Sequence, residues 1–214
     1  LSIFMTLVVQ AFRYAAEPFF FSEAKQGNKP GQTYAQILNY FVFLGGIIFL
    51  GVSFYIDILK YFIAPEYHEG LHVVPILLMA NLFLGIFFNL SIWYKLTEKN
   101  KLGAMISIFG ALVTVGLNYL WIPEIGYLGS AWATFFSYFS MVVISYAFSR
   151  KYYPVPYNIP KVLFYIALAV GLFFVGRYME NEVIGAWNIW SFLVNSGLLA
   201  LYAIIFLSRE KADF

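Results

Sequence analysis

The chain of 214 residues has no cysteine and few charged residues, and each shortage excludes a class of protein. Without cysteine, it cannot be a small secreted domain held together by disulfide bonds. Asp, Glu, Lys and Arg make up 11% of the sequence, against about 25% in an average soluble domain. The net charge of +2 at pH 7 is too small for a basic nucleic-acid-binding surface, so we expect no nucleic-acid partner.

Apolar and aromatic residues are abundant instead. Hydrophobic residues make up 62% of the chain, and they include 24 Phe, 17 Tyr and 5 Trp, which excludes intrinsic disorder. A soluble domain of this length cannot bury so much apolar surface in one core. We therefore expect an integral membrane protein whose partners include membrane lipids.

Seven apolar segments are long enough to cross a membrane as helices. A helix needs about 20 apolar residues to cross the hydrocarbon layer of roughly 30 Å. The segments lack the alternation of membrane β-strands, and most of the prolines fall between them. They comprise residues 1–21, 36–56, 73–94, 102–122, 127–148, 160–178 and 187–208. The predicted fold class is all-α, a polytopic transmembrane helix bundle of about seven spans.

The basic residues between these segments predict the orientation of the chain. Alternate loops hold ten basic residues against two, and the richer side is cytoplasmic by the positive-inside rule. The ten are Lys25, Lys29, Lys95, Lys99, Lys101, Arg150, Lys151, Lys161, Arg209 and Lys211; the two are Lys60 and Arg177. The first span then enters from outside, and the C-terminus is cytoplasmic. Because the chain opens on Leu1 without a signal peptide, we expect it to begin inside a longer protein.

Arg13 and Glu17 are the strong charges within a predicted span. Their spacing of four residues places them on one helix face, where they can pair. A charge within the hydrocarbon costs at least about 2.5–3.5 kcal/mol, so it normally faces a cavity or another helix. One interpretation is a cationic site for an anionic substrate, with Glu17 as counter-ion or as carrier of a proton or cation. The other is a structural ion pair that reaches toward the cytoplasmic end.

A polar stripe runs along the third predicted span. Asn81, Gly85, Asn89 and Trp93 each lie four residues apart, so they share one face. Amides facing lipid would be unsatisfied, so this face meets protein or water. The stripe either lines a hydrophilic cavity for a sugar or makes hydrogen bonds between helices.

Small residues point to close helix packing. Gly129, Ala133 and Ser137 form a small-xxx-small ladder in the fifth span, which we interpret as packing. Gly45 and Gly46 in the second span are either a flexible point or a packing notch.

The chain has little material for catalysis or metal binding. His68 and His72 lie beside Glu66 and Glu69 in a loop, where we interpret them as solvated residues rather than zinc ligands. Neither an H-E-x-x-H motif nor a Gly-rich phosphate loop occurs. We expect no enzyme activity, no cofactor and no bound metal.

The segment Asn118–Ser137, NYLWIPEIGYLGSAWATFFS, resembles a signature of polysaccharide exporters in the multidrug/oligosaccharidyl-lipid/polysaccharide flippase superfamily. The matching residues are Asn118, Ile122, Pro123, Gly126, Gly129, Ala131, Ala133, Thr134 and Ser137. In the signature turn, we expect Pro123 to end one helix and Gly126 to form a tight turn. Phe12–Lys25 and Trp93–Ala104 are similar to the O-antigen flippase branch of lipopolysaccharide biosynthesis.

The resemblance implies a fold and a domain organisation. Residues 1–150 would be spans 8–12 of a fourteen-span flippase, within a C-terminal lobe like that of the MATE antiporters. Residues 151–214 would add two spans and a cytoplasmic tail. The N-terminal half of the same protein would then be a partner of this chain.

The resemblance also implies a function, the transport of a polyprenyl-diphosphate-linked oligosaccharide across the bacterial inner membrane by alternating access. Arg13 would attract the diphosphate, since a guanidinium matches phosphate bidentately. Glu17 would couple transport to H⁺ or Na⁺, and Asn81 and Asn89 would hydrogen-bond the glycan. The alternatives are a drug/cation antiporter of the same superfamily, which would want more acidic residues in its spans, a membrane enzyme, and a non-catalytic membrane scaffold.

Overall fold

The computed structural model describes residues 1–25, 30–184 and 188–212, and every regular element in these ranges is a helix. The long helices are α1 (Ile3–Lys25), α2 (Pro30–Phe54), α4 (Val74–Leu90), α6 (Asn100–Ile125), α7 (Tyr127–Tyr152), α8 (Ile159–Tyr178) and α9 (Ile189–Ala212). The short ones are α3 (Ile56–Leu59), η1 (Lys60–Phe62), η2 (Pro65–Val73), α5 (Ile92–Leu96) and the π-helix η3 (Met179–Ile184). The predicted all-α class is confirmed.

Six helical segments of the described ranges are long and apolar enough to cross a membrane. They are Gly31–Phe54, Pro65–Leu96, Asn100–Ile125, Tyr127–Tyr152, Ile159–Asn181 and Ile189–Glu210, and they correspond to the second to seventh predicted spans. Helix α1 has 23 residues but is not among the six, and it carries Gln10, Arg13 and Glu17 in its middle. The chain is thus a multi-pass helical membrane protein, with an architecture compatible with a transporter.

The chain divides into two compact units. Unit 1 consists of Leu1, Val42–Pro75 and Ile159–Phe214, and unit 2 consists of Ser2–Phe41 and Ile76–Asn158. The units are defined by packing, so the assignment of residues 1–150 and 151–214 to spans of a flippase stays a prediction.

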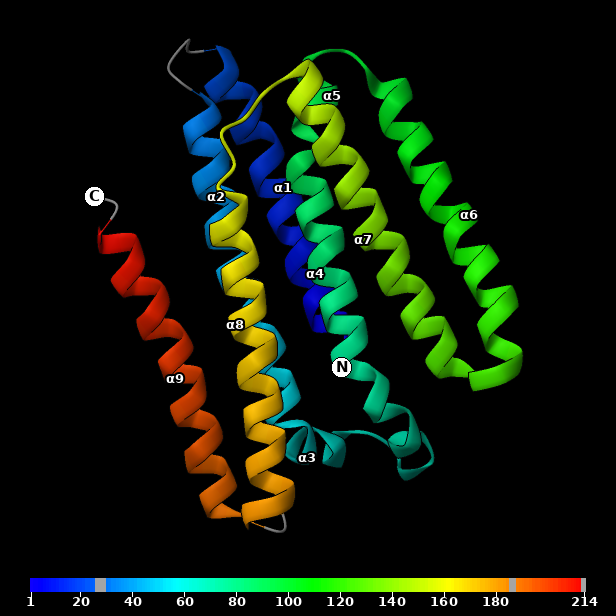
Figure 1. Cartoon of the computed structure of the whole chain (residues 1–214), viewed down its shortest axis with the longest axis vertical. Helices are drawn as coiled ribbons and strands as arrows, with labels where there is room; N and C mark the ends of the chain where they lie inside the picture. The colour runs from blue at the N-terminus through cyan, green and yellow to red at the C-terminus, as the bar shows by residue number, and fades with distance from the viewer. Residues whose placement is uncertain (26–29, 185–187, 213–214) are drawn as a thin grey trace. The chain divides into compact units, whose positions relative to one another are not determined.

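Helices α6 and α7 of unit 2 form a tight antiparallel hairpin that turns at Gly126 (Figure 1). Gly126 has φ 58° and ψ −140°, a backbone region that only glycine adopts without strain. The expectation that Pro123 ends the first helix is wrong, because α6 continues to Ile125. The proline removes one N–H from the helix, but the Gly126 N–H still bonds the Ile122 carbonyl at 2.9 Å.

The α7 face toward α6 is built from small side chains, as the sequence predicts. Gly129, Ala133 and Ser137 are all buried. The Ser137 hydroxyl donates to the Gly110 carbonyl of α6 at 2.7 Å. A Cβ atom on Gly129 would lie 2.8 Å from the Trp121 backbone, so only glycine permits this approach. The ladder is confirmed as packing.

Two apolar clusters hold the rest of unit 2 together. One gathers Ala16 and Phe20 of α1 with Tyr34, Ile92 and Val155. In the other, Trp93 of α5 is fully buried against α6 and α7.

Unit 1 packs α8 and α9 with the C-terminal part of α2. Gly46 is a packing notch, because a Cβ there would collide with the ring and hydroxyl of Tyr202, which is fully buried. Beside it the ring of Phe43 stacks on Phe206, with centroids 3.8 Å apart. The structure therefore decides between the two interpretations of this glycine.

We expect Gly46→Ala to lower the free energy of unfolding by about 1–3 kcal/mol, because the buried Tyr202 ring must move. Gly51→Ala is the matched control on the same helix, since its Cβ would meet only Leu199 at 3.8 Å. Alanine is the better helix former, so this variant is expected to be neutral or slightly stabilising. Thermal unfolding in detergent compares the two, and equal midpoints would contradict the notch.

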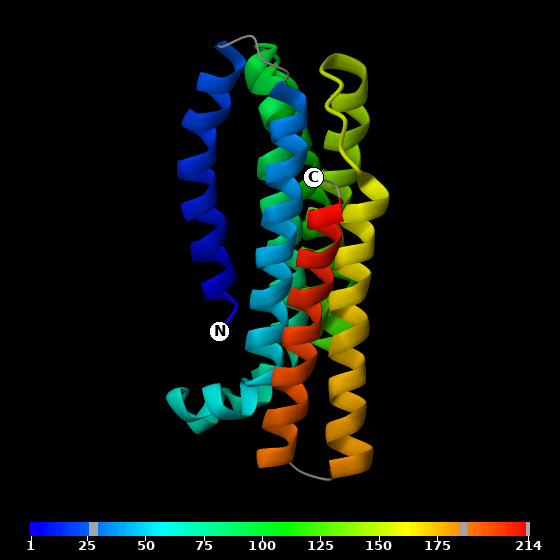
Figure 2. The same cartoon turned by 90° about the vertical axis from the view of Figure 1, so that its left-hand side faces the viewer.

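Short helices follow α2 in unit 1. In Figure 2 the segment α3–η1–η2 runs across the direction of α8 and α9. It begins after a turn at Tyr55, whose hydroxyl lies 2.7 Å from the Ser196 hydroxyl of α9.

Candidate functional site

Three charged side chains meet in unit 2. The Glu17 carboxylate of α1 accepts a hydrogen bond from Arg13 Nε at 3.1 Å and another from Lys95 Nζ at 2.5 Å. Both donors reach the same oxygen, Oε1. Arg13 and Glu17 are one turn apart on α1, and α5 supplies Lys95 directly after α4. We call these three residues the charged cluster.

The charged cluster has an excess of positive charge. Two cations share one carboxylate, and their side chains are 38% exposed for Arg13 and 20% for Lys95. The Arg13 guanidinium also lies over the Phe88 ring, 4.7 Å from its centroid, where a cation is attracted to the face of the ring. Its bond to Glu17 uses Nε, so the two terminal nitrogens are not committed to that carboxylate. Such a group can hold an anion bidentately.

The sequence indicates the Arg13–Glu17 pair but not its third member. Lys95 is 78 residues from Glu17, and in the sequence it counts only as a loop cation after the third span. Neither periodicity nor spacing connects two helices so far apart in the chain. The pairing of α1 with α5 is what brings the two side chains together.

Most of the predicted polar stripe is buried within unit 2. Asn89 is 1% exposed, and neither atom of its amide has a hydrogen-bond partner among the described residues. Asn81 is half-buried. At Gly85 a Cβ would collide with Phe41, so this position serves packing. The stripe therefore supplies one buried amide with unused bonding capacity.

Trp93, the last member of the stripe, has a structural role. Its Nε1–H donates to the Ser145 hydroxyl of α7 at 3.1 Å, and its ring stacks on Tyr152 at 5.8 Å. These contacts attach α5, and with it Lys95, to α7.

The signature turn lies at the end of the hairpin away from α5 (Figure 1). Pro123 lies at the end of α6, Gly126 forms the turn, and Gly129 lies at the start of α7. The Thr134 hydroxyl donates to the Ser130 carbonyl of its own helix at 2.9 Å. Asn118 is half-buried on α6, with an amide oxygen that has no partner among the described residues. The structure gives this turn a packing role and does not bring it to the charged cluster.

Cationic residues gather around α5 in unit 2. The ammonium of Lys99 lies 4.6 Å from the centroid of the Tyr152 ring, and that of Lys151 lies 5.4 Å from it. The start of α6 and the end of α7 therefore share one end of the hairpin with α5 (Figure 1). The basic loops after the third and fifth predicted spans lie at the same end of this unit.

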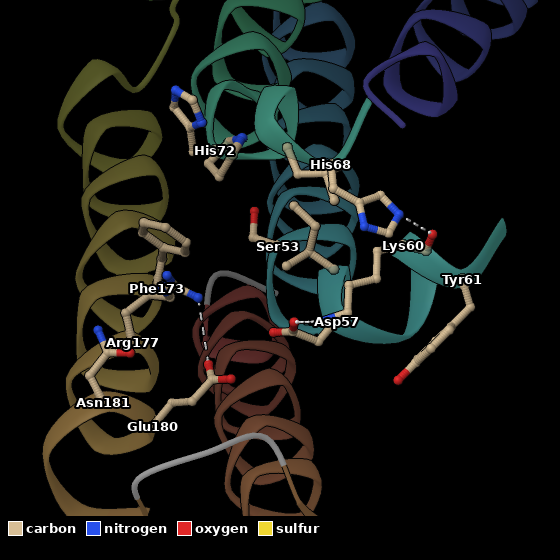
Figure 3. Close-up of a pocket in the computed structure, with 13 residues that line it drawn as sticks. Ser53, Asp57, Lys60, Tyr61, His68, His72, Phe173, Arg177, Glu180 and Asn181 are labelled. Carbon is tan, nitrogen blue, oxygen red and sulfur yellow. Dashed lines mark hydrogen bonds and ion pairs between the residues drawn. The ribbon is translucent and has the colours of Figure 1, made fainter. Parts of the chain in front are cut away.

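A polar cavity of about 740 Å³ occurs in unit 1, where α2 and α8 end (Figure 3). Its lining includes Ser53, Asp57, Lys60, Arg177 and Glu180. Lys60 donates to the Asp57 carboxylate at 2.6 Å, and this bond raises the pKa of Lys60 above its ordinary value. The sequence did not predict this cavity, because its lining residues come from two parts of the chain that are far apart, residues 53–75 and 173–181.

The sequence suggested that His68 is a solvated loop residue, but in the structure its ring bonds the backbone. Its Nε2 lies 3.1 Å from the Lys60 carbonyl and 3.0 Å from the Ile63 carbonyl, so this nitrogen carries a proton and donates. The ring thereby joins η1 to η2. Within the described ranges, no group of three or more His, Cys, Asp or Glu side chains is placed to hold a metal ion.

Comparison with known proteins gives no relative. No family model, no curated protein and no solved structure matches the chain.

Proposed function

We propose that the chain belongs to a transporter that moves a polyprenyl-diphosphate-linked oligosaccharide across the bacterial inner membrane by alternating access. The observation that carries the proposal is the charged cluster, in which Arg13 and Lys95 share the single carboxylate of Glu17. A half-buried site with excess positive charge on apolar helices suits an anion attached to a lipid.

The diphosphate would bind to the guanidinium of Arg13. Its terminal nitrogens are free of the Glu17 bond, and the group is attracted to the face of the Phe88 ring. Lys95 would add a second charge from the side of α5. Phosphate oxygens accept such charge-assisted bonds in preference to neutral ones.

Glu17 would govern release. Its carboxylate competes with the diphosphate for both cations, so a bound H⁺ or Na⁺ on Glu17 would strengthen the cationic site. This makes Glu17 the candidate for ion coupling. The same arrangement argues against a cationic drug as substrate, because two cations already occupy the carboxylate.

The glycan would meet the α4 face. Asn89 has an amide without a partner among the described residues, which costs about 1–3 kcal/mol when buried. In a second state of the cycle this amide would be exposed together with Asn81 and bond sugar hydroxyls. The burial of Asn89 in the present conformation fits a state closed around this face.

The proposed orientation of the chain in the membrane follows from its basic residues. Lys95, Lys99 and Lys151 lie at one end of unit 2, which we assign to the cytoplasmic side. The diphosphate would then be bound where a cytoplasmic substrate enters. The C-terminus would also be cytoplasmic.

An assay of polysaccharide export tests the proposed function. We expect the chain, expressed from its complete reading frame in a bacterial strain without its own O-antigen flippase, to restore surface polysaccharide, measured by gel analysis of lipopolysaccharide. Arg13→Gln is expected to lower this signal at least tenfold. Arg150→Gln is the control, because Arg150 is an exposed residue outside the charged cluster. Full export by Arg13→Gln at native expression would contradict the diphosphate role.

A further inference from the structure

The cavity of unit 1 contains oxygen acceptors with unused capacity. Glu180 is buried, and its partner Arg177 is 3.7 Å away, longer than the roughly 2.7–2.9 Å of a charge-assisted hydrogen bond. The Asp57 carboxylate lines the same cavity as Glu180. The Ser53 hydroxyl, 3% exposed, lines the same cavity and has no partner among the described residues. Figure 3 shows the three side chains around one space.

Adjacent acceptors of this kind match a primary ammonium. Two neighbouring carboxylates repel each other unless a proton or a cationic donor lies between them. Lys60 already donates to Asp57 at 2.6 Å, whereas the cation that pairs with Glu180, Arg177, lies 3.7 Å away. An ammonium group has three N–H donors, one for each of the oxygens on Ser53, Asp57 and Glu180.

The other end of such a ligand would be an anion. The Arg177 side chain is 43% exposed and therefore stands nearer to solvent than Glu180, at 11%. A guanidinium in this position suits a phosphate. The charges of Asp57, Glu180, Lys60 and Arg177 cancel, so the cavity favours a zwitterion over a net anion. A volume of about 740 Å³ leaves room for a small headgroup.

The position of the cavity indicates that the zwitterion is the headgroup of a membrane lipid. It lies where the apolar helices α2 and α8 end, and the segment α3–η1–η2 forms part of its lining (Figure 3). That segment presents Tyr61, Phe62 and Tyr67 with 81%, 85% and 65% of their surface exposed. Exposed aromatic rings at the ends of spans are typical of the headgroup layer of a membrane.

We infer that this cavity binds the headgroup of a phospholipid that carries a phosphate and a primary ammonium, as in phosphatidylethanolamine. The ammonium lies among Ser53, Asp57 and Glu180, and the phosphate lies at Arg177. The aromatic rings of the segment anchor it beside the lipid. The site is in unit 1 and requires neither the charged cluster nor transport. A failure of the proposed function would therefore leave this inference unaffected, and the reverse also holds.

Native mass spectrometry of the purified full chain tests the inference. Phosphatidylethanolamine, phosphatidylcholine and phosphatidylglycerol with identical acyl chains are added singly, and the dissociation constants are compared. We expect phosphatidylethanolamine to bind at least about tenfold more tightly than either other lipid. Glu180→Gln should remove about tenfold of that affinity, since a hydrogen bond to a charged group is lost. Glu66→Gln, an exposed position on η2 outside the cavity lining, should change nothing.

A second variant protects the test against misfolding. Arg177→Gln alters a partly exposed side chain, and it should weaken phosphatidylethanolamine while circular dichroism and thermal unfolding stay unchanged. Equal binding of the three lipids would overturn the inference. So would unchanged affinity in a folded Arg177→Gln protein, or binding of free phosphoethanolamine without binding of the lipid.

Discussion

Arg13→Gln is expected to weaken binding of a short-chain polyprenyl diphosphate by about 10- to 100-fold, whereas Glu17→Gln is expected to strengthen it. The first change removes a guanidinium whose charge-assisted bonds contribute about 1.5–3 kcal/mol. The second removes the carboxylate that holds both Arg13 and Lys95, and so leaves two cations for the diphosphate. Opposite signs at two positions of one salt bridge distinguish a ligand site from a structural pair, for which both changes would only destabilise the protein.

Isothermal titration calorimetry of the purified variants measures this difference. The increase for Glu17→Gln should shrink as salt rises, because the cluster is partly exposed and screened. In the export assay the same variant should transport more slowly, since a more tightly held diphosphate leaves more slowly. Losses of affinity in both variants would refute the competition between Glu17 and the ligand. Arg150→Gln again serves as the control.

Gly129→Ala is expected to have the largest effect on stability, a loss of about 1–3 kcal/mol or more. The added Cβ would lie 2.8 Å from the carbonyl carbon, the carbonyl oxygen and the Cβ of Trp121. Two of these atoms belong to backbone, so no side-chain rotation relieves the collision and the two helices must separate. Separation would also lengthen the bond from the Ser137 hydroxyl to the Gly110 carbonyl, now 2.7 Å.

Gly116→Ala on the same hairpin is the matched control for this prediction. A Cβ at Gly116 meets nothing within 4 Å, so the gain in helix propensity should leave stability equal or slightly higher. Thermal unfolding followed by circular dichroism in detergent compares the two variants with the original chain. A Gly129→Ala protein as stable as Gly116→Ala would show that the hairpin tolerates wider spacing.

The helices and the hairpin were predictable because their signals are local. Long apolar runs specify the spans, and a small residue at every fourth position of α7 specifies the face toward α6. The helix extends past Pro123 because proline removes a single hydrogen bond, and the neighbouring bond to Ile122 persists. One proline near the end of a long apolar helix is therefore not enough to end it.

The candidate sites were predictable only where their members lie one helical turn apart. Arg13 and Glu17 satisfy that condition, but Lys95 joins them through the packing of α5 on α1. The cavity of unit 1 had no such signal. Asp57 and Glu180 are separated by most of the chain, and each alone looks like an ordinary loop acid. Likewise, nothing near Gly46 in sequence indicates that Tyr202 would occupy its notch.

The small-residue face of α7 bears on how the protein is made. Helix α6 leaves the ribosome before α7, and its outward side chains, among them Met105, Leu112 and Val115, are apolar. It can therefore enter the bilayer and remain there by itself. When α7 follows, its face of glycine, alanine and serine residues offers no hydrophobic gain over lipid, so the pair forms by close backbone contact and the hydroxyl bond to Gly110. We therefore expect the hairpin to close only after both helices are in the membrane, through this backbone contact and hydrogen bond.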